Sequence, residues 1–350
     1  MAVRIDLAGG WTDTPPITLT NDNGVVNIAV KVKRKKPITC TIKKVYGCKK
    51  ESLIIRSKQS PNETACFSEI KQLVECSVNS ANFGALICAS LRATGYLNSG
   101  TKTLRELFDV LFSNEKVMGV RIMTSSELPH GSGLGISSII SACFLASLAK
   151  MINVQVDHET IVSTVLKTEQ ILTTGGGWQD QIGGLYPGVK YSTFKNGKII
   201  VSNIQLSAEF EATVQERLVL IYTGQTRLAA DVLHNVVYQF LGAKSALMNN
   251  INCLARDAKE SYNCLLKSQF PVEQCSRYGM LKGQMAHNAL PLDVEILFEN
   301  LENKDIIETG WMCGAGGGGF ACVWLTDHSD ARKRIDYEVY NWVFKNSCNQ

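Results

Sequence analysis

A glycine-rich stretch, Glu-Leu-Pro-His-Gly-Ser-Gly-Leu-Gly-Ile-Ser-Ser at residues 127–138, is well suited to hold an anion. It follows an apolar run expected to be a strand, 117–124, and precedes a run of small and apolar residues, 139–151, expected to be a helix. A strand, a glycine loop and a helix start leave free backbone N–H groups that can surround a phosphate. The paired hydroxyls Ser137 and Ser138 fall in the first helical turn, where one could hold a magnesium ion that bridges phosphates.

This loop fits neither of two common phosphate-binding patterns. It lacks the Gly-Lys-Ser/Thr ending of a Walker A loop, and Ile136 occupies the place of the third glycine in the dinucleotide-binding fingerprint. The acid that this fingerprint requires about 20 residues later would be Asp157, which is better interpreted as a helix cap. A tight turn whose glycines serve packing alone is the alternative at this point.

Two carboxylates downstream of the loop could divide the work of phosphoryl transfer. Residues 157–172 predict a helix in which Glu169 takes the next place on an apolar face. Because a buried carboxylate is costly unless it meets a cation, we expect a metal ion, an arginine or a lysine near Glu169; the alternative is an edge position that reaches solvent. Asp180 follows the three glycines at 175–177. One carboxylate can hold magnesium while the other faces the nucleophile.

Two further glycine stretches stand near the ends of the chain. At 8–16, Ala-Gly-Gly-Trp-Thr-Asp-Thr-Pro-Pro follows a short predicted strand. A carboxylate that accepts hydroxyl hydrogen bonds and a ring that covers an apolar sugar face are typical of a site for a polyhydroxylated ligand; a surface turn with a packed tryptophan is the alternative. At 314–319, five glycines in six residues separate two apolar runs. This pattern indicates a close backbone approach to the first glycine loop or to the ligand, rather than a linker.

The remaining apolar periodicity predicts strands and helices around these motifs. Strands are expected at 3–7, 25–32, 38–46, 218–222, 306–313 and 320–325, with a polar loop that contains a strand at 51–69. Helices are expected at 81–94, 103–112, 229–241, 243–266, 272–289 and 330–344. A domain boundary is expected near 190–212, where polar residues and Asn196-Gly197 interrupt the pattern.

Composition argues against several classes of protein. Among 350 residues, 45% hydrophobic and 19% charged residues describe an ordinary globular protein, and no apolar run reaches the roughly 18 residues of a membrane span. The N-terminus shows no secretory pattern, and twelve cysteines without a Cys-x-x-Cys pair favour buried thiols in a reducing, cytoplasmic setting over a zinc site. The basic run at 31–36 has no interleaved aromatic residues, which favours a solvated hairpin turn over a nucleic-acid site.

In order and spacing, three of these stretches resemble the motifs of the GHMP small-molecule kinases, the family of galactokinase, homoserine kinase, mevalonate kinase and phosphomevalonate kinase. The stretches are 4–13, 129–138 and 314–320, and the resemblance covers nearly the whole chain. Within the family, four stretches resemble the kinase module of the L-fucokinases: 8–16, 127–135, 172–181 and 222–229. Bacterial heptose-phosphate kinases share the Ala-Gly-Gly start but typically lack this tryptophan.

The resemblance implies catalytic, metal and nucleotide roles. Ser138 and Glu169 would be magnesium ligands, and Asp180 would be the catalytic residue that faces the sugar hydroxyl. Arg4 would pair with Asp180 and steady the phosphoryl group, and Arg227 could also reach the phosphates. The nucleotide-binding residues would be those of the loop, Pro129, His130, Gly131, Ser132, Gly133, Leu134, Gly135, Ile136, Ser137 and Ser138.

The sugar site implied by the resemblance draws on both ends of the chain. Asp13 lies where sugar-binding acids lie in galactokinase, and Trp11 or Trp178 could cover the 6-deoxy face of the sugar. Four glycines complete the expected substrate-binding set, namely Gly176, Gly177, Gly316 and Gly317.

The resemblance also implies an α+β, two-lobed fold, with a ribosomal protein S5 domain 2-like, ATP-binding lobe over 1–200 and a ferredoxin-like lobe over 201–350. With ATP as co-substrate and Mg²⁺ as cofactor, the expected reaction phosphorylates the anomeric hydroxyl of L-fucose and gives L-fucose 1-phosphate, on a salvage route to GDP-fucose. A GHMP kinase for another sugar or sugar phosphate, such as a heptose phosphate, is one alternative, and a catalytically silent sugar-binding protein is another.

The expected partners are small molecules, a sugar and ATP, with neither nucleic acid nor membrane. Full-length eukaryotic fucokinases also carry an N-terminal region that resembles a nucleotidylyltransferase. The resemblance therefore implies that this chain lacks such a region.

Overall fold

The computed structural model describes residues 1–20, 23–98, 100–113, 115–129, 131–225, 229–286 and 288–347. By their internal contacts these residues form two compact units. The first comprises residues 1–3, 31–129 and 135–185, and the second comprises 4–30, 130–134 and 186–350. The glycine loop is thus divided between the units: residues 130–134 belong to the second unit, and the residues before and after them belong to the first. The expected division at residue 200 concerns the lobes of the family and stays a prediction.

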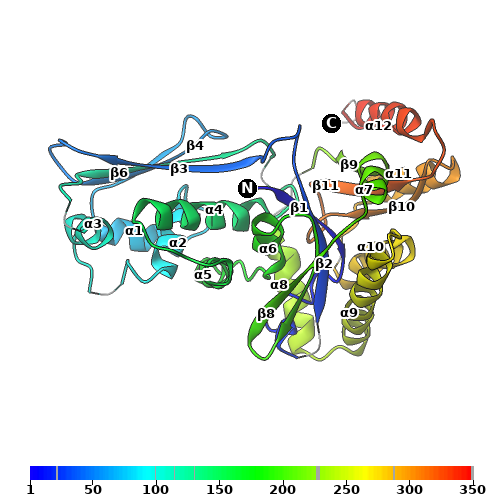
Figure 1. The fold of residues 1–350 in the computed structure, drawn as a ribbon, viewed down its shortest axis with the longest axis horizontal. Helices are drawn as coiled ribbons and strands as arrows, with labels where there is room; N and C mark the ends of the chain where they lie inside the picture. The colour runs from blue at the N-terminus through cyan, green and yellow to red at the C-terminus, as the bar shows by residue number, and fades with distance from the viewer. Residues whose placement is uncertain are drawn as a thin grey trace. The chain divides into compact units, whose positions relative to one another are not determined.

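The first unit consists of a four-stranded sheet with helices on one face, as Figure 1 shows for α1, α2 and α4. Its strands are β3 (Ile38–Val45), β4 (Ser52–Ser57), β5 (Thr64–Phe67) and β6 (Gly119–Ser126), in the order β3-β6-β4-β5. Strand β6 runs parallel to β4, and the other pairs are antiparallel. Its helices are α1 (Ile70–Ser77), α2 (Ala85–Ala93), α3 (Leu104–Phe112), α4 (Ile136–Met151), α5 (His158–Ile171) and α6 (Gln179–Leu185).

The starts of these helices follow from local sequence. Thr103 and Asp157 cap α3 and α5, because their side chains accept hydrogen bonds from backbone N–H groups of the first turn. Helix α4 instead starts after Gly135, a residue that has no side chain to cap the helix. Helix α6 is not predicted by the sequence pattern, because it contains two glycines. A Cβ on Gly184 would lie 2.8 Å from Cγ1 of Ile139 on α4, so tight packing requires glycine there.

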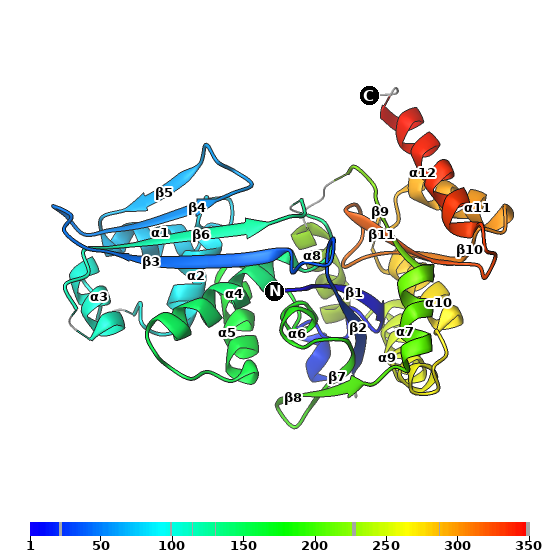
Figure 2. The ribbon, with the colours of Figure 1, turned by 45° about the horizontal axis from the view of Figure 1, so that its top comes forward.

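The second unit contains two sheets, whose strands Figure 2 shows in a second view. The first sheet has the order β1-β2-β7-β8, and the second, antiparallel sheet has the order β10-β11-β9. The strands are β1 (Val3–Ala8), β2 (Gly24–Val30), β7 (Val189–Lys195), β8 (Lys198–Ile204), β9 (Leu218–Tyr222), β10 (Ile307–Met312) and β11 (Phe320–Leu325). The helices are a 3-10 turn at Ile17–Leu19, α7 (Ala208–Arg217), α8 (Ala229–Leu241), α9 (Ser245–Leu266), α10 (Val272–Met285), α11 (Leu292–Asn303) and α12 (Ala331–Ser347).

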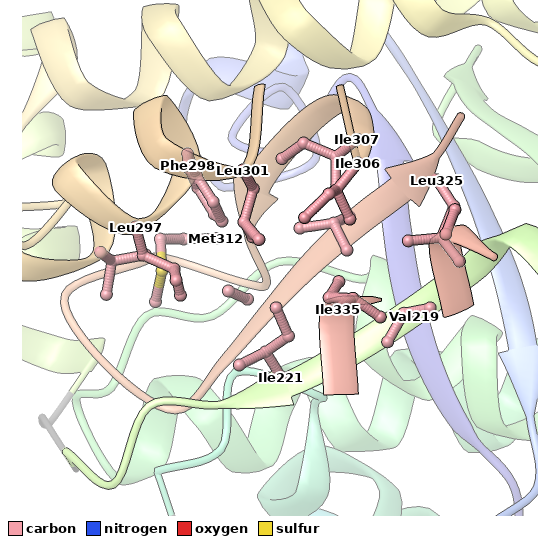
Figure 3. Packing of buried hydrophobic residues seen from close by; sticks show 14 residues of the cluster. Val219, Ile221, Leu297, Phe298, Leu301, Ile306, Ile307, Met312, Leu325 and Ile335 are labelled. Carbon is pink, nitrogen blue, oxygen red and sulfur yellow. The ribbon is translucent and has the colours of Figure 1, made fainter. Parts of the chain in front are cut away.

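An apolar core joins the three-stranded sheet to α11 and α12 (Figure 3). Ile221 and Val323 come from the sheet, Leu297 and Phe298 from α11, and Ile335 from α12. All five are buried, and the pairing of Ile221 with Ala321, two residues before Val323, places the two strand residues on the same face of the sheet. This core fixes the two strands, β10 and β11, that carry the glycine run 314–319 between them.

Most predicted elements are present in the structure, with shifted ends. The pattern does not predict α1, α6, α7 and α11, and the polar stretch expected as a boundary near 190–212 forms the β7–β8 hairpin and the start of α7. The basic run at 31–36 makes an exposed turn in which Val32 bridges Lys35. The predicted hairpin is wrong, because β2 and β3, on either side of this turn, belong to different sheets. Among the described residues, none of the helices combines the length and the apolar character needed to cross a membrane.

Candidate active site

Glu169, near the end of α5, is a buried acid held by hydroxyl groups. Its Oε1 accepts a hydrogen bond from Ser138 Oγ at 2.8 Å, and its Oε2 accepts one from Thr174 Oγ1. Ser138 is buried in the first turn of α4, whereas Ser137 is exposed. The structure therefore brings together Ser138 and Glu169, the two residues predicted to bind magnesium.

The surroundings of Glu169 do not favour its charged form. Burial raises the pKa of the carboxyl, the hydroxyls of Thr174 and Ser138 oppose this rise, and the nearby charge of Asp180 adds to it. Among the described residues, these hydroxyls take the place of the arginine or lysine that the sequence led us to expect. An ionised Glu169 is therefore unfavourable here until a cation approaches it.

Asp180 lies in the first turn of α6, close to the start of α4. A Cβ on Gly135 would lie 2.8 Å from both Cβ and Cγ of Asp180, so this acid can approach the helix start only because residue 135 is glycine. Gly176 leaves room for the other acid in a similar way, since its Cβ would lie 3.3 Å from Cδ of Glu169. Gly177 follows in the same loop. Gly135 and Gly176 thus leave room for the carboxylates of Asp180 and Glu169 in the first unit.

The donor groups at this place fit a magnesium ion. Magnesium prefers hard oxygen ligands and is usually held by one or two carboxylates together with substrate phosphates, rather than by a complete protein cage. Among the described residues, no three or more His, Cys, Asp or Glu side chains form a group that could hold a metal ion. Glu169 and Ser138 offer a carboxylate and a hydroxyl beside the N-terminus of α4, which favours an anion.

In the second unit, the first glycine loop and the glycine run between β10 and β11 pack directly on one another. Phe320 N donates a hydrogen bond to Ser132 O at 2.9 Å. A Cβ on Gly133 would lie 2.5 Å from the carbonyl oxygen of Cys313, and one on Gly314 would lie 2.6 Å from the carbonyl oxygen of Gly133. The predicted close backbone approach between these two stretches is confirmed.

Arg4, on β1, contacts the glycine loop from within the second unit. Its Nη1 donates to the carbonyl oxygen of Gly133 at 2.8 Å and to Oδ1 of Asp6 at 3.0 Å. The backbone N–H of Gly314 donates to the same Asp6 oxygen at 2.9 Å. One carboxylate is therefore connected to both glycine stretches. The pairing of Arg4 with Asp180 stays a prediction, because these residues belong to different units.

Trp11 and Asp13 are buried in the second unit, in the turn after β1. Trp11 has a left-handed backbone conformation, with φ of 79°, and its indole Nε1 is buried with no hydrogen-bond partner among the described residues. In the glycine run, Gly317 N donates to the carbonyl oxygen of Ala289 at 2.7 Å, and a Cβ on Gly316 would overlap that same carbonyl group. The sugar-binding roles of these residues stay predictions.

The other loop residues are distributed over both units. In the part of the chain that the structure describes, Gly131 is exposed, Ser132 and Leu134 are buried in the second unit, and Ile136 is buried at the start of α4. Pro129, at the end of the segment that leads from β6, is half-buried. His130 and Arg227 lie outside the described residues, and their predicted roles stay predictions.

Thr174 and Asp6 had no predicted role. The same holds for Tyr278 and Lys282 of α10, which both donate hydrogen bonds to Asp6. Asp6 could have been found, because Arg4 and Asp6 alternate with apolar residues in a strand whose residues are all buried. This spacing places opposite charges on one face of a buried strand. Nothing in the local sequence marks Thr174, Tyr278 or Lys282, which reach their partners only through the fold.

Sequence comparisons connect the chain to known kinases. The family model described as GHMP kinases N terminal domain matches residues 95–188. The chain is 30% identical over 357 residues to the bifunctional fucokinase/GDP-fucose pyrophosphorylase of Arabidopsis thaliana, covering 98% of this chain and 32% of the relative. It is also 30% identical over 331 residues to the L-fucokinase/L-fucose-1-P guanylyltransferase of Bacteroides fragilis, covering 91% of this chain and 33% of the relative. The chain thus spans about a third of the length of both relatives.

A shorter match connects it to D-glycero-alpha-D-manno-heptose 7-phosphate kinase of Campylobacter jejuni, with 26% identity over 158 residues, 45% of this chain and 46% of the relative. The structure of Lactococcus lactis galactokinase complexed with galactose is similar with a TM-score of 0.66 and 15% identity, over 98% of this chain and 89% of that chain. A mevalonate kinase structure is similar with a TM-score of 0.66 and 16% identity, over 97% and 94% of the two chains. The predicted α+β fold of this family is confirmed. The chain belongs to the GHMP kinases.

Proposed function

We propose that this chain is an ATP-dependent sugar kinase that phosphorylates the anomeric hydroxyl of L-fucose. The observation that carries the proposal is the arrangement at the start of α4, where Asp180 lies against Gly135 while Glu169 accepts a hydrogen bond from Ser138. This arrangement offers separate acids for a metal and for a hydroxyl group beside a helix N-terminus. The 30% identity to two relatives named as fucokinases supports L-fucose as the acceptor.

The nucleotide is proposed to bind with its phosphates at the glycine loop and the start of α4. The N-cap of this 16-residue helix is Gly135, which has no side chain to cap the first N–H groups, and the helix dipole favours an anion there. Glu169 and Ser138 would hold Mg²⁺, which when bound neutralises charge on the β- and γ-phosphates. The cation would also relieve the unfavourable burial of the Glu169 charge.

Asp180 is proposed to orient the sugar hydroxyl and to accept its proton. The sugar oxygen forms a bond to the γ-phosphorus while the bond from this phosphorus to the bridging oxygen breaks, so the products are ADP and the sugar 1-phosphate. A weak base suffices, because an anomeric hydroxyl is more acidic than an ordinary alcohol. Most of the rate enhancement would then come from positioning and charge neutralisation. The contributions of Arg4, Trp11 and Asp13 follow from the resemblance alone.

The names of both bifunctional relatives pair the kinase with a nucleotidyl transfer step. L-Fucose 1-phosphate would accordingly be consumed by a guanylyltransferase that forms GDP-fucose. A kinase for a heptose phosphate is the second candidate, because the chain also matches a heptose 7-phosphate kinase.

A coupled assay of ADP release across a panel of sugars tests the proposal. We expect turnover with L-fucose to exceed turnover with D-galactose and with heptose phosphates. A preference for a heptose phosphate would favour the second candidate. The absence of ADP release with every sugar would favour a catalytically silent protein on this fold.

A further inference from the structure

A cluster of four buried ionisable side chains lies beside the packed glycine stretches of the second unit. Arg4 and Asp6 lie on β1. Tyr278 and Lys282 lie on α10, one helical turn apart from each other. Their exposed fractions are 2%, 0%, 1% and 2%. The proposed reaction gives no part to Asp6, Tyr278 or Lys282. Four ionisable groups at such depth require a physical reason, because unpaired buried charges are strongly destabilising.

The carboxylate of Asp6 is the centre of this cluster. Its Oδ1 accepts hydrogen bonds from Arg4 Nη1 at 3.0 Å and from Gly314 N at 2.9 Å. Its Oδ2 accepts hydrogen bonds from the Tyr278 hydroxyl and from Lys282 Nζ, the latter at 3.4 Å. The backbone carbonyl of Asp6 also accepts a hydrogen bond from Trp311 Nε1 at 2.8 Å. A single side chain thus binds groups from β1, from α10 and from the glycine run.

The partners of Asp6 are themselves bound to the glycine stretches. Arg4 Nη1 donates to the carbonyl oxygen of Gly133 at 2.8 Å, which holds the first loop. Lys282 Nζ donates to the carbonyl oxygen of Met312 at 2.6 Å, at the end of β10 where the glycine run begins. Two paths therefore lead from one carboxylate to the two stretches, and a third, through Gly314 N, is direct.

The charges in the cluster keep Asp6 ionised. Burial alone would raise the pKa of this carboxyl, but Lys282, Arg4, the Gly314 N–H and the Tyr278 hydroxyl together lower it. An ionised carboxylate is a stronger hydrogen-bond acceptor than a neutral carboxyl group or an amide. The connection between the glycine stretches therefore depends on the charge of Asp6 as well as on its shape.

We infer that Asp6 is a positioning residue, which fixes the loop 131–134 and the glycine run 314–319 against one another and thereby sets the affinity for the nucleotide. The nucleotide part of this inference rests on the proposed function. The connection between the two stretches does not, because it can be measured in the protein without ligand. The two parts can therefore fail separately.

The test compares Asp6→Asn with a matched control, Asp257→Asn. Asp257 is also fully buried in the second unit, and its Oδ1 accepts a hydrogen bond from Arg277 Nη2 at 2.9 Å, between α9 and α10. Hydrogen exchange of the ligand-free proteins is measured by mass spectrometry. In Asp6→Asn we expect exchange to rise about tenfold in peptides from both glycine stretches at once, whereas in Asp257→Asn these peptides keep their wild-type rates.

Kinetics provide the second measurement on the same variants. In Asp6→Asn the KM for MgATP is expected to rise about tenfold while the KM for the sugar stays within about twofold, a selective change that a general loss of stability would not cause. Tyr278→Phe removes one donor and keeps the charge of Asp6, so it should shift both measurements in the same direction by less. This variant also serves if Asp6→Asn does not fold.

Unchanged exchange in both glycine stretches of Asp6→Asn and of Tyr278→Phe would overturn the inference. Raised exchange with an unchanged KM for MgATP would support the connection between the two stretches and overturn the nucleotide part of the inference. If the wild-type protein binds no ATP, the proposed function is overturned. The nucleotide part of the inference then falls with it, while the connection between the glycine stretches is still tested by hydrogen exchange.

Discussion

Glu169 in the first unit and Asp6 in the second are both buried acids beside a glycine stretch, yet their surroundings have opposite effects. Asp6 meets Arg4 and Lys282, and its pKa is lowered despite burial. Burial raises the pKa of Glu169 and the charge of Asp180 adds to this rise, although the hydroxyls of Thr174 and Ser138 oppose it. Among the described residues, the protein thus provides cationic partners for Asp6 and none for Glu169.

This difference separates an acid that holds the fold from an acid that is suited to a ligand. A carboxylate with its own cations and N–H donors is satisfied before any ligand arrives, and it can position loops. A carboxylate that is buried without a cation raises the free energy of the empty protein, and this cost is recovered when a cation binds. The comparison therefore assigns positioning to Asp6 and metal binding to Glu169, each as a proposal with its own test.

The largest expected effect concerns Asp180, whose charge adds to the effect of burial on the pKa of Glu169. Asp180→Asn keeps the shape against Gly135 but cannot accept a proton, so we expect kcat with L-fucose to fall roughly 10²- to 10⁴-fold. ATP affinity, measured by calorimetry, should stay close to that of the wild type. Asp157→Asn is a suitable control, because asparagine also caps helices and Asp157 only caps α5 in our account. Near-normal turnover in Asp180→Asn would remove its proposed role.

A second prediction concerns the close packing that Asp6 is inferred to maintain. Gly133 and Gly197 have nearly the same left-handed backbone, with φ of 74° and 76°, but only Gly133 has neighbours that a Cβ would meet. Gly197→Ala should lower the free energy of unfolding by about 1 kcal/mol, through backbone strain alone. Gly133→Ala should cost about 1–3 kcal/mol more, because its Cβ would overlap the Cys313 carbonyl group. Equal losses in chemical denaturation would contradict the packing described for the second unit.

The smallest expected effect is the stability of Glu169→Gln, and its sign separates the two acids. Because the folded-state pKa of Glu169 is raised above the ordinary value of 4.5, its ionisation opposes folding, and this penalty grows as the pH rises through the folded pKa. At neutral pH and without ligand, Glu169→Gln should therefore be more stable than the wild type, by about 1 kcal/mol, with the gain vanishing near pH 4.

The opposite sign holds for Asp6, whose folded-state pKa is lowered from 3.8. Its charge contributes stability above that ordinary value, and this contribution is lost as the pH falls through the lowered pKa. Asp6→Asn should accordingly be less stable than the wild type at neutral pH. Thermal unfolding of both variants between pH 4 and pH 8 checks the pair, and two changes of the same sign would refute the comparison.

Sequence reasoning predicted the parts of the site that depend on local pattern. The cap Asp157, the strand–loop–helix order around 127–138 and the approach of the two glycine stretches all follow from residue type and spacing. A run of five glycines in six residues is informative because only glycine allows backbone to pass so close to backbone.

The parts that could not be predicted depend on packing between distant segments. Helix α6 contains Gly183 and Gly184, which disfavour a helix in isolation. In the fold it packs closely on α4, where Gly184 has no side chain that would overlap Ile139. The partners of Asp6 on α10 are more than 270 residues away in the chain, so no local pattern could reveal them. Likewise, Glu169 accepts hydrogen bonds from two hydroxyl groups instead of meeting the cation that we expected. The sequence shows that this acid lies on an apolar helix face, but it does not show whether its cation comes from the protein or from a ligand.

The most direct test of the account is the magnesium dependence of nucleotide binding in the wild type and in Glu169→Gln. Calorimetric ATP affinity is measured at increasing Mg²⁺ concentration, with Asp6→Asn as the comparison. We predict that Glu169→Gln requires at least about tenfold more Mg²⁺ for half-maximal binding, while Asp6→Asn binds more weakly at every Mg²⁺ concentration with an unchanged midpoint. A Glu169→Gln titration that superimposes on that of the wild type would contradict the central claim that this buried acid takes its cation from the bound nucleotide.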